Sequence, residues 1–338
     1  MSAAVDEGTT GGTAGNAAGN AAGSAAGLKS AGDREVARGT LQGAGAYALW
    51  GVFPLYFHLL LPAGAVEIVL HRVVWSLAVC LLLVAVLRDT GWVRPLLRAP
   101  RSLLTLAVAA VVIAVNWGVY VYAVNSGHVV EAALGYFVNP LVTVLAGVVV
   151  LHERLRRLQW AAVALGLVAV VVLTVDYGRP PWIALVLAVS FATYRLMKNK
   201  VGVGLGALAS LTSETVLLAP FAVVGLVWLG LSGSGTFTQQ PPGHALLLVS
   251  TGLATAGPLL LFAAAARRVP LTTIGLLQFM TPVLQLLCGV LLLGEDVPPS
   301  RWVGFGIVWL ALVLLSVDSV RTARRRSRAR LEAPALAV

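Results

Sequence analysis

Charged residues are scarce in this sequence of 338 residues. Asp, Glu, Lys and Arg make up 11% of it, and its mean hydropathy is +0.88, whereas a soluble domain is about 25% charged. This composition excludes an ordinary soluble enzyme or binding domain. Cysteine is scarce as well. Cys80 and Cys288 lie in apolar stretches without metal-ligand spacing, so we expect them to pack as small apolar side chains.

Motifs that bind phosphate or support hydrolysis are missing too. The GLKS of residues 27–30 is not a Walker A loop, the HERLR of residues 152–156 is not HExxH, and GxSxG does not occur. The sequence therefore predicts no catalytic residue, no metal and no cofactor. A primary pump would need a separate ATPase subunit, so transport driven by a gradient is the simplest mechanism left.

Long apolar runs, in contrast, are abundant. A helix needs about 20 apolar residues to cross about 30 Å of hydrocarbon, and ten runs come close to that length. We therefore predict an all-α integral membrane protein with ten transmembrane helices. The third and fourth runs touch and the sixth is short, so nine or eleven spans remain alternatives. The ten runs cover approximately residues 43–61, 66–87, 102–124, 129–151, 158–175, 182–198, 208–230, 244–264, 271–293 and 301–320.

The two ends of the chain differ from its apolar middle. Residues 1–40 are of low complexity, rich in Gly, Ala and Asn, and are expected to form a disordered tail. They contain no apolar segment of a signal peptide. Residues 321–338 form a second, basic tail that begins RTARRRSRAR.

Positive residues alternate between the predicted loops. Because Lys and Arg remain in the cytoplasm, their distribution predicts cytoplasmic tails and cytoplasmic loops after the even-numbered spans. It also explains the net charge of +10 by topology and lipid contact, without nucleic acid. The loops after odd-numbered spans hold only Arg179 and Arg301. The loops after even-numbered spans hold twelve: Arg88, Arg94, Arg98, Arg101, Arg154, Arg156, Arg157, Arg195, Lys198, Lys200, Arg267 and Arg268.

One segment occurs twice with its charges changed. LAGVVVLHERLRRLQW at residues 145–160 aligns without a gap to LCGVLLLGEDVPPSRW at residues 287–302. We call the number of residues that separates Leu145 from Leu287 the repeat offset. The copy keeps the apolar residues but has lost the arginines. Because each half holds five spans, the second half would enter the membrane upside down and turn this loop outward. We therefore predict two inverted five-helix repeats, residues 41–176 and 177–320.

Polar side chains inside the apolar runs are candidates for function, because they are costly at bilayer depth. Pro140 and Pro282 occupy equivalent positions and are expected to kink spans four and nine beside a central cavity. Glu214, inside span seven, is the candidate for proton coupling and a possible counterpart of Glu67. The residues predicted to bind the solute are Asn116, Tyr120, Tyr136, Asn139 and Gln278. Those predicted to gate the outer mouth are Glu67, His71, Arg72 and Glu131.

Structural roles compete with these functional ones. The carboxylates could sit at the water interface, and an ion pair with His71 or Arg72 could serve packing alone. Asn116 and Asn139 could be interhelical hydrogen bonds. The tryptophans are interpreted mostly as interfacial belt or packing residues: Trp75, Trp117, Trp160, Trp182 and Trp302.

Several segments resemble a known family. They are ALWGVFPLYF at 48–57, the pattern Glu67, His71, Arg72, Trp75 and Ser76, the long segment at 116–155 that begins NWGVYVYAVNSGHVVEAALGYF, and VPLTTIGLLQFMTPVLQ at 269–285. The chain resembles RarD proteins, of the EamA group in the drug/metabolite transporter superfamily, over roughly residues 41–320. This resemblance implies ten helices, two EamA repeats and a permease of the bacterial inner membrane. It carries over no substrate residue.

We therefore expect a secondary transporter that moves a small organic solute, a metabolite or a drug, by alternating access. An intramembrane enzyme is a second hypothesis, but only His71 and Glu67 make a plausible pair, and no serine or cysteine accompanies them convincingly. A non-transporting sensor or scaffold is a third, and its expected large soluble domain or interaction loop is not evident in the sequence.

Overall fold

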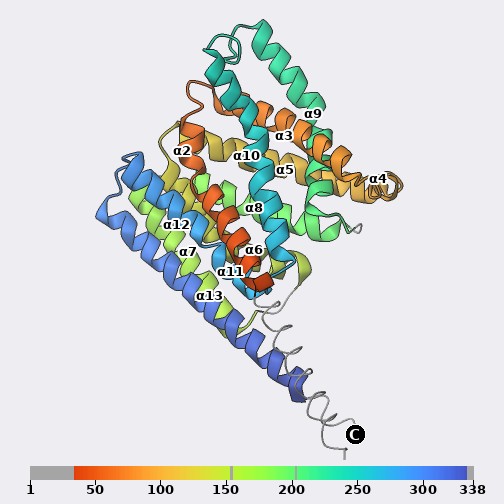
Figure 1. The fold of residues 1–338 in the computed structure, drawn as a ribbon. Coiled ribbons are helices and arrows are strands. Elements are labelled where there is room, and N and C mark those ends of the chain that lie inside the picture. The colour runs from red at the N-terminus through yellow and green to blue at the C-terminus, as the bar shows by residue number, and fades with distance from the viewer. Residues whose placement is uncertain (1–33, 153–154, 202–203, 333–338) are drawn as a thin grey trace, which may run out of the picture.

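The computed structural model describes residues 34–152, 155–201 and 204–332, and all regular structure in these ranges is helical (Figure 1). Within these ranges, eight helical spans are long and apolar enough to cross a membrane, which confirms the expectation of an all-α, multi-pass membrane protein. In chain order the elements are a first helix over residues 34–51, α2 (Phe53–His58), α3 (Ala65–Leu87), α4 (Val93–Leu97), α5 (Pro100–Asn125), α6 (Val129–Leu151), α7 (Arg157–Tyr177), α8 (Trp182–Lys200), α9 (Ala207–Leu231), α10 (Pro242–Ala266), α11 (Leu271–Leu277), α12 (Met280–Leu287), the π-helix η1 (Cys288–Leu292) and α13 (Pro299–Glu332).

Two of the predicted spans are interrupted helices. The first is divided at Val52, directly before α2, where Pro54 cannot donate a backbone hydrogen bond. The ninth is divided between α11 and α12, and Pro282 lies in the first turn of α12. Helix α6, however, runs as one helix through Pro140. The two prolines, equivalent in the sequence repeat, therefore do not have equivalent local structures.

Four helices of the first half have a counterpart in the second half that starts one repeat offset later in the sequence. This holds even for helices whose sequences are only weakly similar. Helices α3, α5, α6 and α7 start at Ala65, Pro100, Val129 and Arg157, and helices α9, α10, α11 and α13 start at Ala207, Pro242, Leu271 and Pro299. This register makes Glu214 the positional counterpart of Arg72, so the expected correspondence of Glu214 with Glu67 is wrong.

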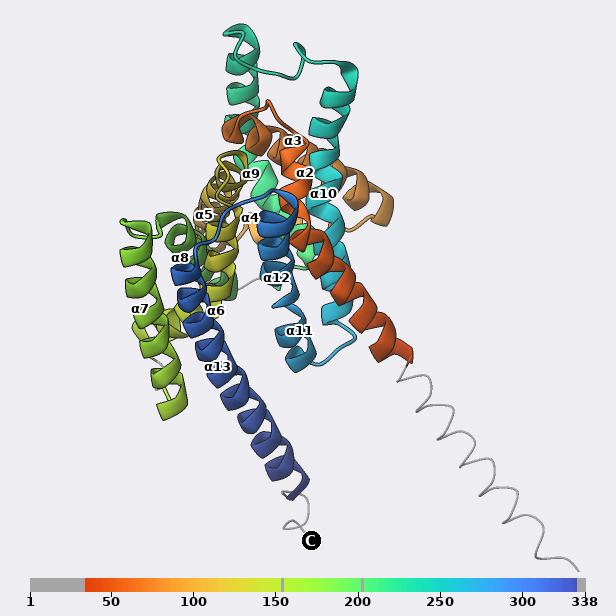
Figure 2. The same ribbon diagram turned by 90° about the vertical axis from the view of Figure 1, so that its left-hand side faces the viewer.

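Helices α7 and α13 lie side by side and antiparallel (Figures 1 and 2). Arg301 at the start of α13 donates to Asp176 at the end of α7 over 2.9 Å, and Arg156 directly before α7 donates to Asp318 on α13, also over 2.9 Å. The two aspartates are themselves separated by the repeat offset. An arginine close to the start of each helix therefore forms the same kind of ion pair with an aspartate of its counterpart.

Two further counterpart pairs are antiparallel. Helix α3 packs against α9, and Glu67 near the start of α3 accepts the backbone N–H of Thr236 beyond the end of α9, at 2.6 Å. Helix α6 packs against α12, and Glu295 beyond η1 accepts the backbone N–H groups of Val129 and Val130, at 2.5 and 2.8 Å. Three counterpart pairs are thus antiparallel, with the helices of each pair side by side.

The apolar core lies in two main clusters. One joins α6, α7 and α13 around Phe137, Leu173 and Phe305, all of them buried. The other joins α2, α5 and α8 and includes Phe57 and Tyr120. The second cluster supplies part of the aromatic surroundings of the candidate site described below.

The ends of the described chain are helical. Residues 34–40 belong to the first helix, so the predicted disorder of residues 1–40 is wrong over that part, and residues 1–33 lie outside the described residues. Helix α13 continues through the basic segment to Glu332. The start of the first helix and the end of α13 lie at the same end of the bundle (Figure 2).

Replacing Asp176 by Asn should lower the stability of the folded protein. Asp176 is 7% exposed, whereas its partner Arg301 is 19% exposed, so loss of this pair should cost about 1–2 kcal/mol, less than the loss of a fully buried pair. The thermal midpoint of the purified protein in detergent measures the effect. Asp89→Asn, at an exposed position, is the matched control. An unchanged midpoint for Asp176→Asn would contradict a stabilising role of the pair.

Candidate functional site

Arg72 is a buried positive charge inside α3. Its side chain lies about 10 Å along the helix from the start at Ala65, and the residue is 5% exposed. Gly252 lets α10 cross α3 closely, because a β-carbon there would lie 2.3 Å from the Trp75 carbonyl oxygen. This crossing brings Thr255 to Arg72. The Thr255 hydroxyl accepts a hydrogen bond from Arg72 Nε at 2.8 Å.

Aromatic rings surround the guanidinium. Its central carbon lies 4.1 Å from the centroid of the Trp117 ring, 5.6 Å from that of Phe57 and 5.8 Å from that of Phe53. Each distance is within the range of a cation–π interaction. The rings come from α2 and α5, so three separate helices and α10 meet at this charge.

The guanidinium has no ionic partner in the described part of the chain. Its only hydrogen bond to those residues is the one from Nε, and neither Nη1 nor Nη2 has an acceptor there. Cation–π contacts stabilise a desolvated cation by about 2 kcal/mol, whereas a buried charge that lacks its partner costs about 3–5 kcal/mol. The rings and one hydroxyl group stabilise the cation, but they leave its Nη1 and Nη2 donors without an acceptor among the described residues.

A second polar group near Arg72 also lacks a partner. The Tyr120 hydroxyl is buried and forms no hydrogen bond with described residues. Its ring packs edge-on against those of Phe57, at 5.9 Å, and Tyr136, at 5.7 Å. Because Phe57 lies 5.6 Å from the Arg72 guanidinium carbon, Tyr120 and, through it, Tyr136 border the aromatic surroundings of Arg72. The site thus contains two predicted solute-binding tyrosines and one predicted gating residue.

The other predicted gating residues lie apart from Arg72. Both oxygens of Glu67 accept hydrogen bonds from Thr236, beyond α9. Glu131, 1% exposed, pairs with Arg179 at 2.9 Å and accepts the backbone N–H of Ile183 near the start of α8 at 3.0 Å. Arg72 therefore pairs with neither carboxylate, and the four predicted gating residues do not form one cluster.

His71 faces a different part of the protein from Arg72. Its Nδ1 accepts a hydrogen bond from Trp75 Nε1 at 3.2 Å, and its ring stacks on Phe237 at 4.7 Å. Its Nε2 is buried and has no partner among the described residues. Phe237 also donates its backbone N–H to Glu67, so His71 and Glu67 both contact the segment that follows α9.

The remaining predicted solute-binding residues are spread over three places. The Asn116 side-chain amide donates to the Leu187 carbonyl at 3.0 Å and to the Ser190 hydroxyl at 2.9 Å, so it joins α5 to α8. Asn139 is 7% exposed in α6, and its carbonyl accepts from Thr143. Gln278 lies at the break between α11 and α12. The structure thus places only Tyr120 and Tyr136 of this group beside Arg72.

Glu214 lies at a polar site of its own between α8 and α9. It is 2% exposed, accepts a hydrogen bond from Lys198 Nζ at 2.6 Å, and lies 3.2 Å from both the Tyr194 and the Ser210 hydroxyl oxygens. Protonation of this carboxylate would remove its ionic attraction for Lys198. No three His, Cys, Asp or Glu side chains of the described residues are grouped as metal ligands.

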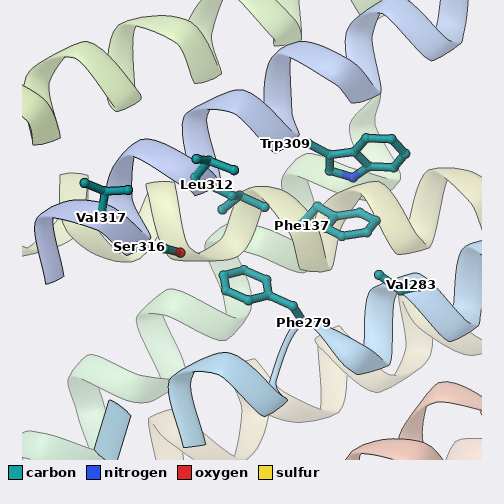
Figure 3. Close-up of a pocket in the computed structure, with 8 residues that line it drawn as sticks. Phe137, Phe279, Val283, Trp309, Leu312, Ser316 and Val317 are labelled. Atoms are coloured by element: carbon teal, nitrogen blue, oxygen red, sulfur yellow. The ribbon is translucent and has the colours of Figure 1, made fainter. Parts of the chain in front are cut away.

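A cavity of about 340 Å³ lies between α6, α12 and α13 (Figure 3). It borders spans four and nine, where the sequence predicted a central cavity, but none of the predicted solute-binding residues lines it. Phe137, Phe279 and Trp309 project toward it in Figure 3. The lining is almost entirely apolar and consists of Phe137, Phe279, Val283, Trp309, Leu312, Val313, Ser316 and Val317.

The aromatic and hydroxyl partners of Arg72 were not identified from the sequence. Phe53 and Phe57 belong to the preceding helix α2, Thr255 lies on the distant α10, and the sequence alone favours a packing role for Trp117. One signal was present: Trp117 and Tyr120 are three residues apart and therefore share a helix face. That face points toward the arginine.

Comparisons with known proteins agree with the fold. The model of the EamA-like transporter family matches residues 37–175 and again residues 181–317. The protein RarD of Streptomyces exfoliatus is 58% identical over 303 residues, which cover 90% of this chain and 95% of that relative. An uncharacterized transporter of Pseudomonas aeruginosa is 44% identical over 290 residues, which cover 85% and 96%. A solved crystal structure with 17% identity covers 84% of this chain and 98% of its own, with a TM-score of 0.52, and shows the fold alone.

Replacing Glu295 by Ala should expose the start of α6 to exchange with solvent. The carboxylate accepts the N–H groups of Val129 and Val130, and loss of such a cap costs about 1 kcal/mol. Amide hydrogen exchange of peptides covering these two residues should accelerate about fivefold or more. Asp296→Ala, at the exposed neighbouring position, should leave the exchange unchanged. Equal exchange in the two variants would contradict the capping role of Glu295.

Proposed function

The chain belongs to the EamA-like transporter family and, within it, to the RarD proteins of the drug/metabolite transporter superfamily; from that premise we propose that it is a secondary transporter of a small organic solute, a metabolite or a drug, that works by alternating access. Its membrane is the bacterial inner membrane, and both of its tails are cytoplasmic. The observation that carries this proposal is the antiparallel pairing of helices whose starts are separated by the repeat offset.

Inverted repeats would produce this pairing. Two related halves that cross the membrane in opposite directions place each helix antiparallel to its counterpart where the two meet. Three counterpart pairs, α3 with α9, α6 with α12 and α7 with α13, have this arrangement. The two separate matches to the family model, at residues 37–175 and 181–317, support the division into halves at residues 41–176 and 177–320.

Other packing contacts also occur in both halves, with each helix replaced by its counterpart. Helix α3 packs on α10, and its counterpart α9 packs on α5. Helix α6 packs on α8, where Gly135 lies against the Ala184 backbone. Correspondingly, α12 packs on the first helix, where Thr281 donates to the Tyr47 carbonyl at 2.9 Å and Gln285 to the Trp50 carbonyl at 3.1 Å. These contacts support ten spans, with the first helix and α8 as the counterparts that open each half.

The solute passes along the seam between the two halves. Arg72, Tyr120 and Tyr136 belong to the first half, and Thr255 belongs to the second, so this group lies where the halves meet. Tyr120 and Tyr136 supply an apolar wall of the path, while Asn116, Asn139 and Gln278 supply hydrogen bonds to the solute. Asn116 becomes free for that role only when α5 separates from α8.

Carboxylates and His71 close the outer end of the path. Under the predicted topology the starts of α3 and α6 face outward. Glu67, Glu131 and Glu295 bind backbone N–H groups at this end, and His71 lies against the segment held by Glu67. Opening of the outer mouth requires that some of these contacts separate. Each carboxylate accepts its hydrogen bonds from residues outside its own helix. All the bonds of one carboxylate can therefore break together when its helix moves away from those residues.

Glu214 is the residue proposed to couple transport to protons. Replacement by Gln should leave downhill exchange of solute between proteoliposomes and medium intact but abolish its stimulation by a proton gradient, since the variant cannot release or accept the proton. Counterflow of a panel of radiolabelled amino acids, organic acids and sugars identifies the transported solute for this measurement. Asp89→Asn is the exposed control.

Two results would contradict this account in different ways. Gradient stimulation that survives Glu214→Gln removes Glu214 from coupling but leaves transport standing. A purified wild-type protein that moves no panel member, although it is folded by its thermal midpoint, contradicts the transport function itself.

A further inference from the structure

We infer that the transported solute carries a carboxylate or phosphate group, and that the terminal edge of the Arg72 guanidinium binds this group. The inference deepens the proposed transport function, on which it rests. It starts from a mismatch in the described structure. Each of the buried glutamates Glu67, Glu131 and Glu214 has cationic, hydroxyl or backbone donors around it, whereas Arg72 has no anion.

The groups left without partners among the described residues at this site can all donate a hydrogen bond. Arg72 uses Nε for the Thr255 hydroxyl, which leaves the Nη1 and Nη2 hydrogens directed away from that bond. The Tyr120 hydroxyl is likewise buried without a partner. A guanidinium edge presents two parallel N–H groups that match the two oxygens of a carboxylate or of a phosphate. An acceptor-rich oxyanion therefore fits this set of donors, and a cation or a donor-rich neutral group does not.

The rings of the site define the part of the solute next to its anionic group. Trp117, Phe53 and Phe57 lie around the guanidinium, and Tyr120 packs on Phe57. A body that is aromatic or apolar can pack against these rings, whereas a fully hydrated one would leave its polar groups without partners. The chemical class is therefore an aromatic or apolar organic acid, or a phosphate ester of similar shape.

The position of Arg72 connects binding of this anion to alternating access. Arg72 is 5% exposed, so most of its side chain is covered in this conformation. Its one polar contact with the described residues, Thr255, lies on α10 of the second half, while the rings lie on α2 and α5 of the first. Separation of the halves would take Thr255 from Arg72 and open the guanidinium to solute from one side of the membrane.

Matched pairs of small probes test the inference on the full-length protein in lipid nanodiscs. The pairs are benzoate with benzamide, phenylacetate with phenylacetamide, and phenyl phosphate with phenol, and inorganic phosphate serves as a probe without an organic body. Binding is measured by isothermal titration and by the shift of the thermal midpoint. The variants are Arg72→Lys, Arg72→Gln and, as a control of equal charge change at an exposed position, Arg98→Gln.

Wild type and Arg98→Gln should bind the anionic member of at least one pair about tenfold or more tightly than the neutral member. Arg72→Lys should weaken that preference, because it lacks the planar fork, and Arg72→Gln should abolish it. Tighter binding of the carboxylates or of phenyl phosphate distinguishes the two anion types. The comparison of pairs in wild type needs no variant, so it remains decisive even where Arg72→Gln fails to fold.

Wild-type protein that binds neutral and anionic members equally, or binds neither, overturns the inference. Folded Arg72→Gln that keeps the preference for anions also overturns the inference. So does phenol binding as tightly as phenyl phosphate while inorganic phosphate does not bind, because the rings alone would then determine binding. Failure of the transport function would be a separate result. If the protein binds benzoate through Arg72 but moves no solute in proteoliposomes, the binding site stands and the proposed transport function is contradicted.

Discussion

Three pairs of counterpart helices, α3 with α9, α6 with α12 and α7 with α13, meet antiparallel in the described part of the structure, and these contacts join residues 41–176 to residues 177–320. In the pair α7 and α13, an arginine close to the start of each helix binds an aspartate of the other, Asp176 at the end of α7 and Asp318 in the interior of α13. In the pairs nearer the seam, a glutamate accepts backbone N–H groups beside the end or the start of its counterpart. Polar contacts at helix ends thus fix the direction of each helix against its counterpart. The apolar surfaces, which lack direction, fill the space between.

The buried charges divide into those that hold the fold and one that does not. Carboxylates at helix ends are satisfied by hydrogen bonds or ion pairs, as buried charges in a stable protein generally are. Arg72 is surrounded by rings and one hydroxyl, and has no anion among the described residues. A stabilising role would have been served equally well by an apolar side chain of similar volume. The difference between Arg72 and the glutamates is the physical reason for placing the solute at Arg72 and for assigning the glutamates to closure and coupling.

The sequence predicted the helical class and the approximate bounds of the eight long apolar helices, because hydropathy is a local property that can be read from a single chain. It did not predict the break in the first span or the break between α11 and α12 at Gln278 and Phe279. Asn116 illustrates the reason for the misses at the site. Its position inside a span marks it as polar and buried, but only the packing of α5 on α8 shows that its amide is already engaged. The partners of Arg72 come from α2, α5 and α10, and no spacing within one helix relates them.

Sidedness of two equivalent positions tests the inverted arrangement most directly. Arg157 and Pro299 are exposed, start α7 and α13, and are equivalent under the repeat offset. Single cysteines at these positions, in a chain whose Cys80 and Cys288 have been replaced by Ala, can be labelled with a membrane-impermeant maleimide in intact cells and in opened membranes. Inverted halves predict that Pro299→Cys reacts in intact cells and that Arg157→Cys reacts only after the membrane is opened. Reaction of both cysteines from the same side would contradict the account.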